Sequence, residues 1–227
     1  MKSASLIEIV QQLETIGFIK HKMVPYASPS FLVSKKNVDT NGNEVKTGHR
    51  LVVDYRALNA NTQVPISPFP DLRAVLDSLH GCNYFSLLDL HSGFHQILVD
   101  EPTHDLLAFT TPIGTYVWLV MPFGPSGCPT YCHAEISYLL SDILFKNVSL
   151  WGDDIIIGGS TIGSCVQRTV YVLERLQANK WYLNAKKCKF AQPSLKSLGV
   201  IIQQGVFTPD LEKFEVICRL PYHLRRP

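Results

Sequence analysis

Residues 147–158 read Asn-Val-Ser-Leu-Trp-Gly-Asp-Asp-Ile-Ile-Ile-Gly, two short apolar runs that flank the adjacent acids Asp153 and Asp154. Two such runs separated by a glycine-containing turn are typical of a β-hairpin, so the carboxylates are expected at the turn or beside it. Adjacent carboxylates repel one another and resist ionisation unless a cation lies between them. The pair therefore indicates a metal site, although a polar hairpin turn is a common alternative.

A third acid, Asp89, follows the apolar run of residues 84–88, which predicts a buried strand. From the end of a strand, a carboxylate could face the same cation as Asp153 and Asp154. Carboxylate oxygens are the ligands that hard cations such as Mg²⁺ prefer. The three acids together favour magnesium-dependent chemistry on phosphates.

The composition is that of an ordinary globular protein, with 227 residues, 46% hydrophobic and 18% charged. This length makes one domain, or one domain and a fragment of a second. No apolar run is long enough to span a membrane and the N-terminus lacks the apolar centre of a signal peptide, so we expect a cytoplasmic or nuclear protein that is not secreted. The six cysteines have no framework spacing, which favours reduced thiols.

The net charge of +2 is too small to indicate a nucleic-acid partner, but its distribution is uneven. Residues 180–190 contain four lysines and no acid, and residues 20–56 are also rich in lysine and arginine. Such runs indicate local basic surfaces, although solvated charged faces are their commoner explanation.

Hydrophobic periodicity predicts helices and strands in a mixed order. An amphipathic helix is expected from a capping box at Ser5 and Glu8 to Gly17. Another is expected after a cap at Ser164, with an apolar stripe of Val166, Val170, Leu173 and Leu176. Further helices are expected from Asp71 and after Pro129. Strands are expected at residues 31–34, 51–55, 84–90, 96–100 and within 109–121, with hairpin turns near 41–43 and 203–205. This order indicates an α+β fold with helices on one face of a sheet.

Five segments then match a known pattern in order. They are R-L-V-V-D-Y-R-A-L-N at 50–59, L-D-L-H-S-G-F-H-Q-I at 88–97, A-F-T-T-P at 108–112, M-P-F-G at 121–124 and L-N-A-K-K-C-K-F at 183–190. Together they resemble the reverse transcriptase of long-terminal-repeat retrotransposons, closest to the gypsy-like group and more distantly retroviral enzymes. Each motif alone is weak, but five in the right order are a strong indication.

The resemblance implies the fingers and palm of a right-hand polymerase, with an antiparallel palm sheet backed by helices and the thumb largely absent. One reverse transcriptase domain would fill residues 1–227, with fingers at about 1–64 and 98–127, palm at about 65–97 and 128–207, and the start of a thumb at about 208–227. Thumb, ribonuclease H and integrase segments of a polyprotein would lie outside the chain, which would work in the cytoplasm, the nucleus or virus-like particles.

The implied activity is RNA-directed DNA polymerisation, in which a deoxynucleoside triphosphate is joined to a primer 3′-hydroxyl on an RNA or DNA template. Two Mg²⁺ ions, or Mn²⁺, would be held by Asp89, Asp153 and Asp154. The remaining implied site residues fall into two groups. Nucleotide contacts would come from Lys35, Arg50, Phe94, Phe123 and Gly124, and template or primer contacts from Gly127, Trp151 and Gly152.

The side-chain chemistry agrees with two of the roles that the resemblance implies. The Arg50 guanidinium suits a forked phosphate contact, whereas Lys35 supplies a point charge. The Phe94 ring matches a steric gate that rejects a ribose 2′-hydroxyl, and a core aromatic residue is the alternative reading.

The chain departs from the family pattern in two places. Trp151 stands where the family has tyrosine, and P-S-G-C-P-T-Y-C-H at 125–133 replaces the commoner L-x-N-A-P-x-x-F-Q. Cys128, Cys132 and His133 lack a second ligand pair at zinc spacing, which favours core thiols and an ordinary polar histidine. A second function therefore stays open, a catalytically silent relic that keeps the fold and weak nucleic-acid binding.

Overall fold

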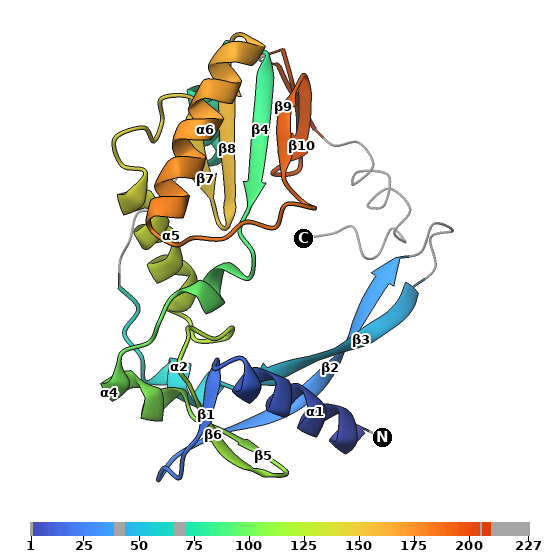
Figure 1. Ribbon diagram of the computed structural model, residues 1–227, viewed down its shortest axis with the longest axis vertical. Helices are drawn as coiled ribbons and strands as arrows, with labels where there is room; N and C mark the ends of the chain where they lie inside the picture. The colour runs from blue at the N-terminus through green and yellow to red at the C-terminus, as the bar shows by residue number, and fades with distance from the viewer. Residues whose placement is uncertain (1, 39–43, 66–70, 205, 210–227) are drawn as a thin grey trace, which may run out of the picture. The chain divides into compact units, whose positions relative to one another are not determined.

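Two units make up the structure, a computed structural model that describes residues 2–38, 44–65, 71–204 and 206–209 (Figure 1). Met1–Ser67 and Ser92–Cys132 form unit 1, and Pro68–His91 and His133–Pro227 form unit 2. Each unit is thus assembled from two separate stretches of the chain. The expected turn at residues 41–43 lies outside the described residues.

Unit 1 contains a five-stranded sheet in the order β1-β6-β5-β2-β3. Its strands are β1 (Ile19–His21), β2 (Ser28–Val38), β3 (Glu44–Val53), β5 (Phe109–Thr111) and β6 (Gly114–Trp118). The long antiparallel pair β2–β3 carries residues 50–53, the start of the motif at 50–59. Short helical segments complete this unit, namely α2 (Arg56–Ala60), η1 (Gly93–Gln96), α4 (Glu101–His104) and η2 (Asp105–Leu107).

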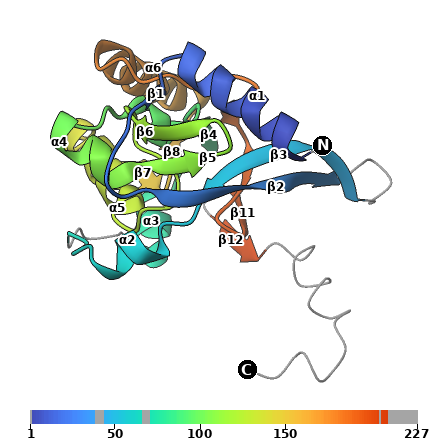
Figure 2. The same cartoon turned by 90° about the horizontal axis from the view of Figure 1, so that it is seen from below.

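Helix α1 (Lys2–Thr15) packs against β1, β2 and β3, and it closes the core of unit 1 through Leu6 and Val10 (Figure 2). The expected capping box at Ser5 is wrong, because the helix already begins at Lys2. The expected end is confirmed. Gly17 has a φ of 77°, its N–H donates to the carbonyl of Glu14, and the next amide donates to that of Leu13, which is the Schellman arrangement that favours glycine.

Unit 2 is built on a four-stranded antiparallel sheet in the order β7-β8-β4-β9. The strands are β7 (Val148–Trp151), β8 (Asp154–Gly159), β4 (Tyr84–Asp89) and β9 (Lys189–Gln192). A second sheet of three antiparallel strands follows, formed by β10 (Ser194–Ser197), β11 (Val200–Gln203) and β12 (Val206–Pro209). Three helices accompany the sheets, α3 (Leu72–Ser78), α6 (Ile162–Ala178) and α5 (Cys128–Leu139), which starts within unit 1.

The four-stranded sheet is covered on both faces, so the expectation of helices on one face is wrong. A Cβ atom built on Gly158 would lie 2.5 Å from the Cys82 sulfur, just after α3, whereas one built on Gly159 would lie 2.4 Å from the amide nitrogen of Cys165 in α6. Successive residues of a strand point to opposite faces. Helix α6 therefore lies on one face, and the end of the α3 segment lies on the other.

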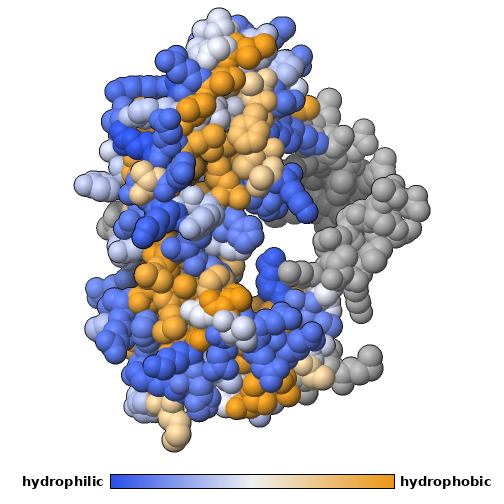
Figure 3. Space-filling model, viewed as in Figure 1, coloured by the Kyte–Doolittle hydropathy of each residue, from blue (hydrophilic) through white to orange (hydrophobic). Residues whose placement is uncertain are grey.

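The inner face of α6 agrees with the expected apolar stripe at Leu176 but differs from it at Val166 and Val170. Its buried residues are Cys165, Thr169, Val172 and Leu176, while Val166 and Val170 are each 45% exposed. Apolar side chains accordingly run along the outer surface of this helix (Figure 3). The cap is Thr161, which exchanges hydrogen bonds with Ser164 in a capping box.

Three further findings concern the remaining expectations. No strand forms at residues 96–100, where only the single bridge Leu98↔Val120 is present. The five described cysteines are free thiols, four of them buried. No helix in the described part of the chain is long and apolar enough to cross a membrane. The α+β class itself is confirmed.

Candidate active site

The two adjacent acids lie at the turn of a hairpin, as the sequence predicts. Trp151 of β7 pairs with Asp154 of β8, which leaves Gly152 and Asp153 as the two turn residues. Gly152 has a φ of 62° and occupies the first of these positions, where a type II′ turn favours glycine. A Cβ atom there would meet nothing within 4 Å. The glycine is therefore required by backbone conformation and not by crowding.

Asp89 lies beside this turn because the last residue of β4 pairs with the first residue of β8. The ladder runs in register through six residue pairs and ends at Asp89↔Asp154. It is anchored by Ile155, Ile156 and Ile157, which are fully buried. The side chains of residues directly opposite each other in an antiparallel pair are neighbours, with Cβ atoms roughly 5 Å apart. The structure thus brings Asp89, Asp153 and Asp154 together.

The electrostatics of this cluster are unfavourable for the charged form of Asp154. Burial raises the pKa of Asp154 from its ordinary value of 3.8 to about 6, and the negative charges of Asp153 and Asp89 add to that rise. The Lys187 ammonium opposes it. The negative charges that Asp89 and Asp153 place beside Asp154 create a potential that a bound cation would relieve.

Lys187 is a member of this site that the sequence did not assign to it. Its Nζ lies 3.1 Å from Oδ2 of Asp89, whose side chain is only 15% exposed. The preceding loop is held to the end of β4. Asn184 donates its N–H to the Asp89 carbonyl over 2.9 Å, and the Asp89 N–H lies 3.5 Å from the Cys188 sulfur. The signal in the sequence was the L-N-A-K-K-C-K-F motif, which carries all three residues.

The carboxylates suit a divalent cation for two reasons. Their oxygens are the ligands that hard cations prefer, and a cation would relieve the repulsion between their negative charges. Among the described residues, no three His, Cys, Asp or Glu side chains converge closely enough to hold a metal ion. Asp89 is engaged instead by the ammonium of Lys187. A cation would thus complete the site by drawing the three carboxylates toward itself, with Asp89, Asp153 and Asp154 as the ligands.

A cluster of aromatic rings in unit 1 contains two of the expected nucleotide-binding residues. The rings of Phe94 and Phe123 have centroids 4.9 Å apart and are tilted by 55°. Phe123 is 54% exposed, whereas Phe94 is partly buried. His95 extends the cluster inward, with ring contacts to Phe123 and Trp118. Phe94 therefore packs against the exposed ring of Phe123 and is not a residue of the deep core.

Gly124, next to this cluster in sequence, is required by its surroundings. It has a φ of 120°, and a Cβ atom would lie 3.0 Å from the Tyr55 ring. Asn59 holds the same loop, because its side-chain amide donates to the Gly124 carbonyl over 3.0 Å and accepts from the Ser126 N–H over 2.9 Å. This positioning role of Asn59 was missed, although the residue closes the motif at 50–59. Gly127 is less confined, with its nearest neighbour at 3.9 Å.

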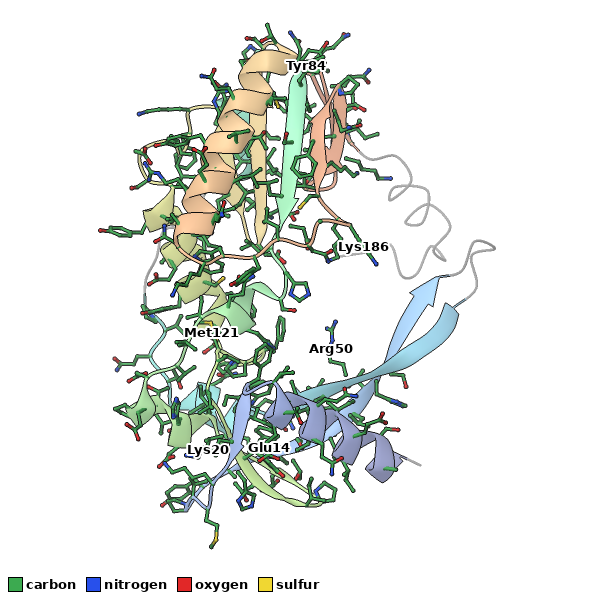
Figure 4. The ribbon with its side chains drawn as sticks, in the orientation of Figure 1. Glu14, Lys20, Arg50, Tyr84, Met121 and Lys186 are labelled. Atoms are coloured by element: carbon green, nitrogen blue, oxygen red, sulfur yellow. The ribbon has the colours of Figure 1, made fainter. Side chains whose placement is uncertain are left out.

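The two expected cationic residues lie on the β2–β3 ribbon of unit 1. Arg50 is exposed on β3 opposite Val33, and Lys35 pairs with Gly48 next to an irregularity in the ladder (Figure 4). Trp151 and Gly152 belong to the hairpin of unit 2, and Trp151 is partly buried. Lys186 lies on the loop beyond α6, at the opposite end of the unit 2 sheet from Tyr84.

The sequence that forms these elements matches the model of a known protein family. Residues 33–202 match the family described as reverse transcriptase (RNA-dependent DNA polymerase). The chain belongs to the reverse transcriptase family. Its relatives include the retrovirus-related Pol polyproteins from transposon 297 and transposon gypsy of Drosophila melanogaster, 32% and 31% identical to it over 93% of its length. The Tf2-3 transposon polyprotein of Schizosaccharomyces pombe is 31% identical over the same share.

These relatives are much longer than the chain, which spans 20% of the transposon 297 and gypsy polyproteins and 15% of the Tf2-3 polyprotein. Matching reverse transcriptase structures include the foamy viral protease-reverse transcriptase with an RNA/DNA hybrid, with a TM-score of 0.81 at 22% identity over 96% of this chain and 28% of that one. The same protein with dsDNA gives a TM-score of 0.82 over 97% of this chain and 44% of that one. The expected fingers-and-palm fold is thereby confirmed.

Proposed function

We propose that this chain is the polymerase part of a retrotransposon Pol polyprotein and joins deoxynucleoside triphosphates to a primer 3′-hydroxyl on an RNA or DNA template. The observation that carries the proposal is the pairing of Asp89 with Asp154 beside the Asp153 turn. Membership of the reverse transcriptase family supports it. The fingers would comprise about residues 1–64 and 98–127, and the palm about 65–97 and 128–207.

Asp89, Asp153 and Asp154 would hold two Mg²⁺ ions, or Mn²⁺. Bound divalent cations would lower the pKa of the primer hydroxyl and neutralise charge on the triphosphate. The protein's own contribution is to hold the three carboxylates next to one another. With a pKa of about 6, Asp154 is mostly ionised at neutral pH. Lys187 would leave Asp89 as cations bind, because the ammonium and a metal ion compete for the same oxygen.

The nucleotide would be contacted by residues of unit 1. Arg50 is exposed and carries a forked set of donors suited to phosphate oxygens, and Lys35 would add a second positive charge. The Phe94 ring, held by Phe123, would lie under the sugar. Gly124, kept in place by Asn59, would let the backbone approach the nucleotide closely.

The template and primer would be contacted through Gly127, Trp151 and Gly152, chiefly at phosphates and sugars, because a copying enzyme takes sequence from base pairing. Two matching structures hold an RNA/DNA hybrid and dsDNA, which supports partners of this kind. The polyprotein relatives support thumb, ribonuclease H and integrase segments as further parts of the whole product.

Primer extension tests the proposal. The folded chain should add nucleotides to a primer on an RNA template only when Mg²⁺ or Mn²⁺ is present. Asp153→Asn should lower the rate of addition at least about 10³-fold. Asp77→Asn, which neutralises an exposed acid on α3, is the matched control and should not change it. A folded wild-type chain that extends no primer with either metal would overturn the proposal and favour the silent relic.

A further inference from the structure

We propose that Ser86 is a positioning residue for the candidate active site. Its hydroxyl holds a bulge in β9, and the one-residue shift that this bulge introduces places Lys187, and not Cys188, opposite Asp89. The inference rests on the proposed function, because it gives Ser86 a part in arranging the carboxylates that would hold the metal ions. It also accounts for the ion pair between Lys187 and Asp89.

The bulge lies where β9, at the edge of the four-stranded sheet, pairs with β4 (Figure 1). On β4, the paired residues Phe85 and Leu87 are separated by the single residue Ser86. Their partners on β9, Gln192 and Lys189, are separated by two residues. One residue of β4 thus faces two of β9, which is the definition of a β-bulge. Bulges are common beside active sites, where they redirect side chains.

The shift in register decides which side chain meets the carboxylate at the end of β4. Leu87 pairs with Lys189 after the bulge. Two residues further on in the same register, Asp89 lies opposite Lys187, whose Nζ is 3.1 Å from Oδ2 of the carboxylate. Without the bulge, the register on its other side would continue and set Cys188 opposite Asp89. Because side chains alternate between the faces of a strand, this slip would also turn Lys187 to the other face.

The Ser86 hydroxyl supplies the hydrogen bond that the bulge needs. A bulge leaves its extra residue outside the ladder, so the amide of that residue requires another acceptor. Ser86 is fully buried, and its Oγ accepts a hydrogen bond from the Ala191 N–H over 3.0 Å. Thr169 of α6 donates to the same oxygen over 2.9 Å. The acceptor is thus fixed in place between β9 and the helix.

The backbone of Ala191 shows that the bulge has to be held. Its φ is 46°, a left-handed conformation that residues with a side chain rarely adopt. Such a conformation persists only where the surrounding structure enforces it. The hydrogen bond from Ala191 to Ser86 is a contact that does so. Glycine, in contrast, adopts this conformation readily.

The test compares loss of the acceptor with loss of a neighbouring hydroxyl. Ser86→Ala removes the acceptor, and Ser86→Cys replaces that variant if it does not fold, because a thiol is only a weak acceptor. Thr169→Val is the matched control, since it removes a hydroxyl of the same cluster and keeps the bond between Ser86 and Ala191. Ala191→Gly, added to Ser86→Ala, is the rescue, because glycine favours the φ of the bulge.

The first readout is disulfide formation across the two strands, which needs neither metal nor activity. Asp89→Cys and Lys187→Cys, combined with Cys188→Ser, place two thiols at opposed positions. They also remove the ion pair, so that the register depends on the bulge alone. Mild oxidation should join positions 89 and 187, and Ser86→Ala should slow this reaction at least about tenfold, because a disulfide requires close and aligned Cβ atoms.

In the same background, Thr169→Val should leave the rate of disulfide formation unchanged, and Ala191→Gly should restore the rate in the Ser86→Ala chain. Peptide mapping by mass spectrometry identifies the joined cysteines. An unchanged rate in Ser86→Ala, or an equal loss in Thr169→Val, would overturn the inference.

The second readout is the rate of nucleotide addition in single turnover, with Asp89, Lys187 and Cys188 in place. Ser86→Ala should lower the maximal rate about tenfold with the apparent affinity for the nucleotide unchanged, and added Ala191→Gly should recover most of it. A disulfide rate that falls while nucleotide addition does not would also overturn the positioning role. If the wild-type chain is inactive, the proposed function fails, and the disulfide comparison still decides whether Ser86 sets the register.

Discussion

At the scale of single residues, Asp154 has an electrostatic cost that can be measured. Its pKa of about 6 in the folded chain lies above its ordinary value of 3.8, so the folded state favours the protonated form. Below about pH 4 both states hold the proton and the cost vanishes. Above pH 6 the folded state must carry the charge, and stability is lost relative to a neutral residue.

Asp154→Asn should therefore raise the free energy of unfolding at pH 7.5 without metal by about 1–3 kcal/mol, the lower part of this range allowing for solvent screening. The gain should disappear near pH 4. Urea unfolding at the two pH values measures the difference. Millimolar Mg²⁺ should stabilise the wild-type chain more than the variant, because it binds the native carboxylates. Equal stability of both proteins at pH 7.5 would contradict the cost of burying the Asp154 charge beside Asp153 and Asp89.

Phe94 gives a second prediction at this scale. If its ring blocks a ribose 2′-hydroxyl, Phe94→Val should improve the selectivity for ribonucleotides over deoxynucleotides at least about tenfold in kcat/KM, or 1.4 kcal/mol. Phe94→Tyr should leave selectivity nearly unchanged, because it keeps the ring. Phe123→Leu is the control for the loss of aromatic packing. Equal losses for both sugars in the Val variant would identify Phe94 as a packing residue.

The sequence predicted the carboxylate hairpin but could not predict the pairing of Lys187 with Asp89. The hairpin depends on local signals, two apolar runs and one glycine. The ion pair joins residues 98 positions apart and forms because Leu183 bridges to Leu90 and Asn184 bonds to the Asp89 carbonyl. Such contacts depend on tertiary pairing that hydrophobic periodicity does not contain.

At the scale of elements, the contact between α6 and β8 depends on glycine. A Cβ atom on Gly159 would approach backbone atoms of Cys165 to 2.4 and 2.7 Å, which no side-chain movement can relieve. Gly159→Ala should therefore push α6 away from the sheet and lower the free energy of unfolding by about 1–3 kcal/mol. Gly163→Ala, in the first turn of α6 and with its nearest neighbour at 3.9 Å, should be neutral or stabilise by up to about 1 kcal/mol.

Urea unfolding of both variants checks this pair. Similar stability of the two would show that α6 can shift without cost. The same close approach explains why Val166 and Val170 of the expected stripe lie on the outer face, while Leu176 is buried as expected. The periodicity of Val166 and Val170 is a valid helical stripe, but the face against β8 needs small residues, and Cys165 and Thr169 provide them. Hydrophobicity alone favoured the larger, exposed side chains.

At the scale of the whole molecule, nucleic-acid binding should depend strongly on salt. A protein that neutralises about six phosphates loses roughly 10³-fold in affinity between 50 and 200 mM salt. We expect the chain to bind a primer–template weakly and with a steep dependence of this kind. Fusion to the segment that follows the matched region in the transposon 297 polyprotein should tighten binding by adding phosphate contacts. Fluorescence anisotropy against salt concentration measures both effects, and a flat salt dependence would contradict them.

The fold class was predictable at this scale because local signals and the ordered motifs agreed, and the α+β fingers-and-palm fold is confirmed. Composition marks the first crossing between the units, at Pro65, Pro68 and Pro70, but not the second, between His91 and Ser92. This second crossing arises from contacts such as those of His95 with Trp118 and Phe123, which join residues 92–97 to unit 1.

The chain passes between the two units three times, and this has a consequence for inheritance. The core of unit 1 combines Leu6 and Val53 with Phe109 and Val120, and that of unit 2 combines Phe85 with residues from the second stretch, Ile156 and Ile202. A genetic crossover between two diverged copies within residues 68–132 would therefore mismatch both cores at once. Closely packed interiors tolerate such mismatches poorly. Recombination should then conserve this stretch as one block, with viable exchange points beyond its two ends.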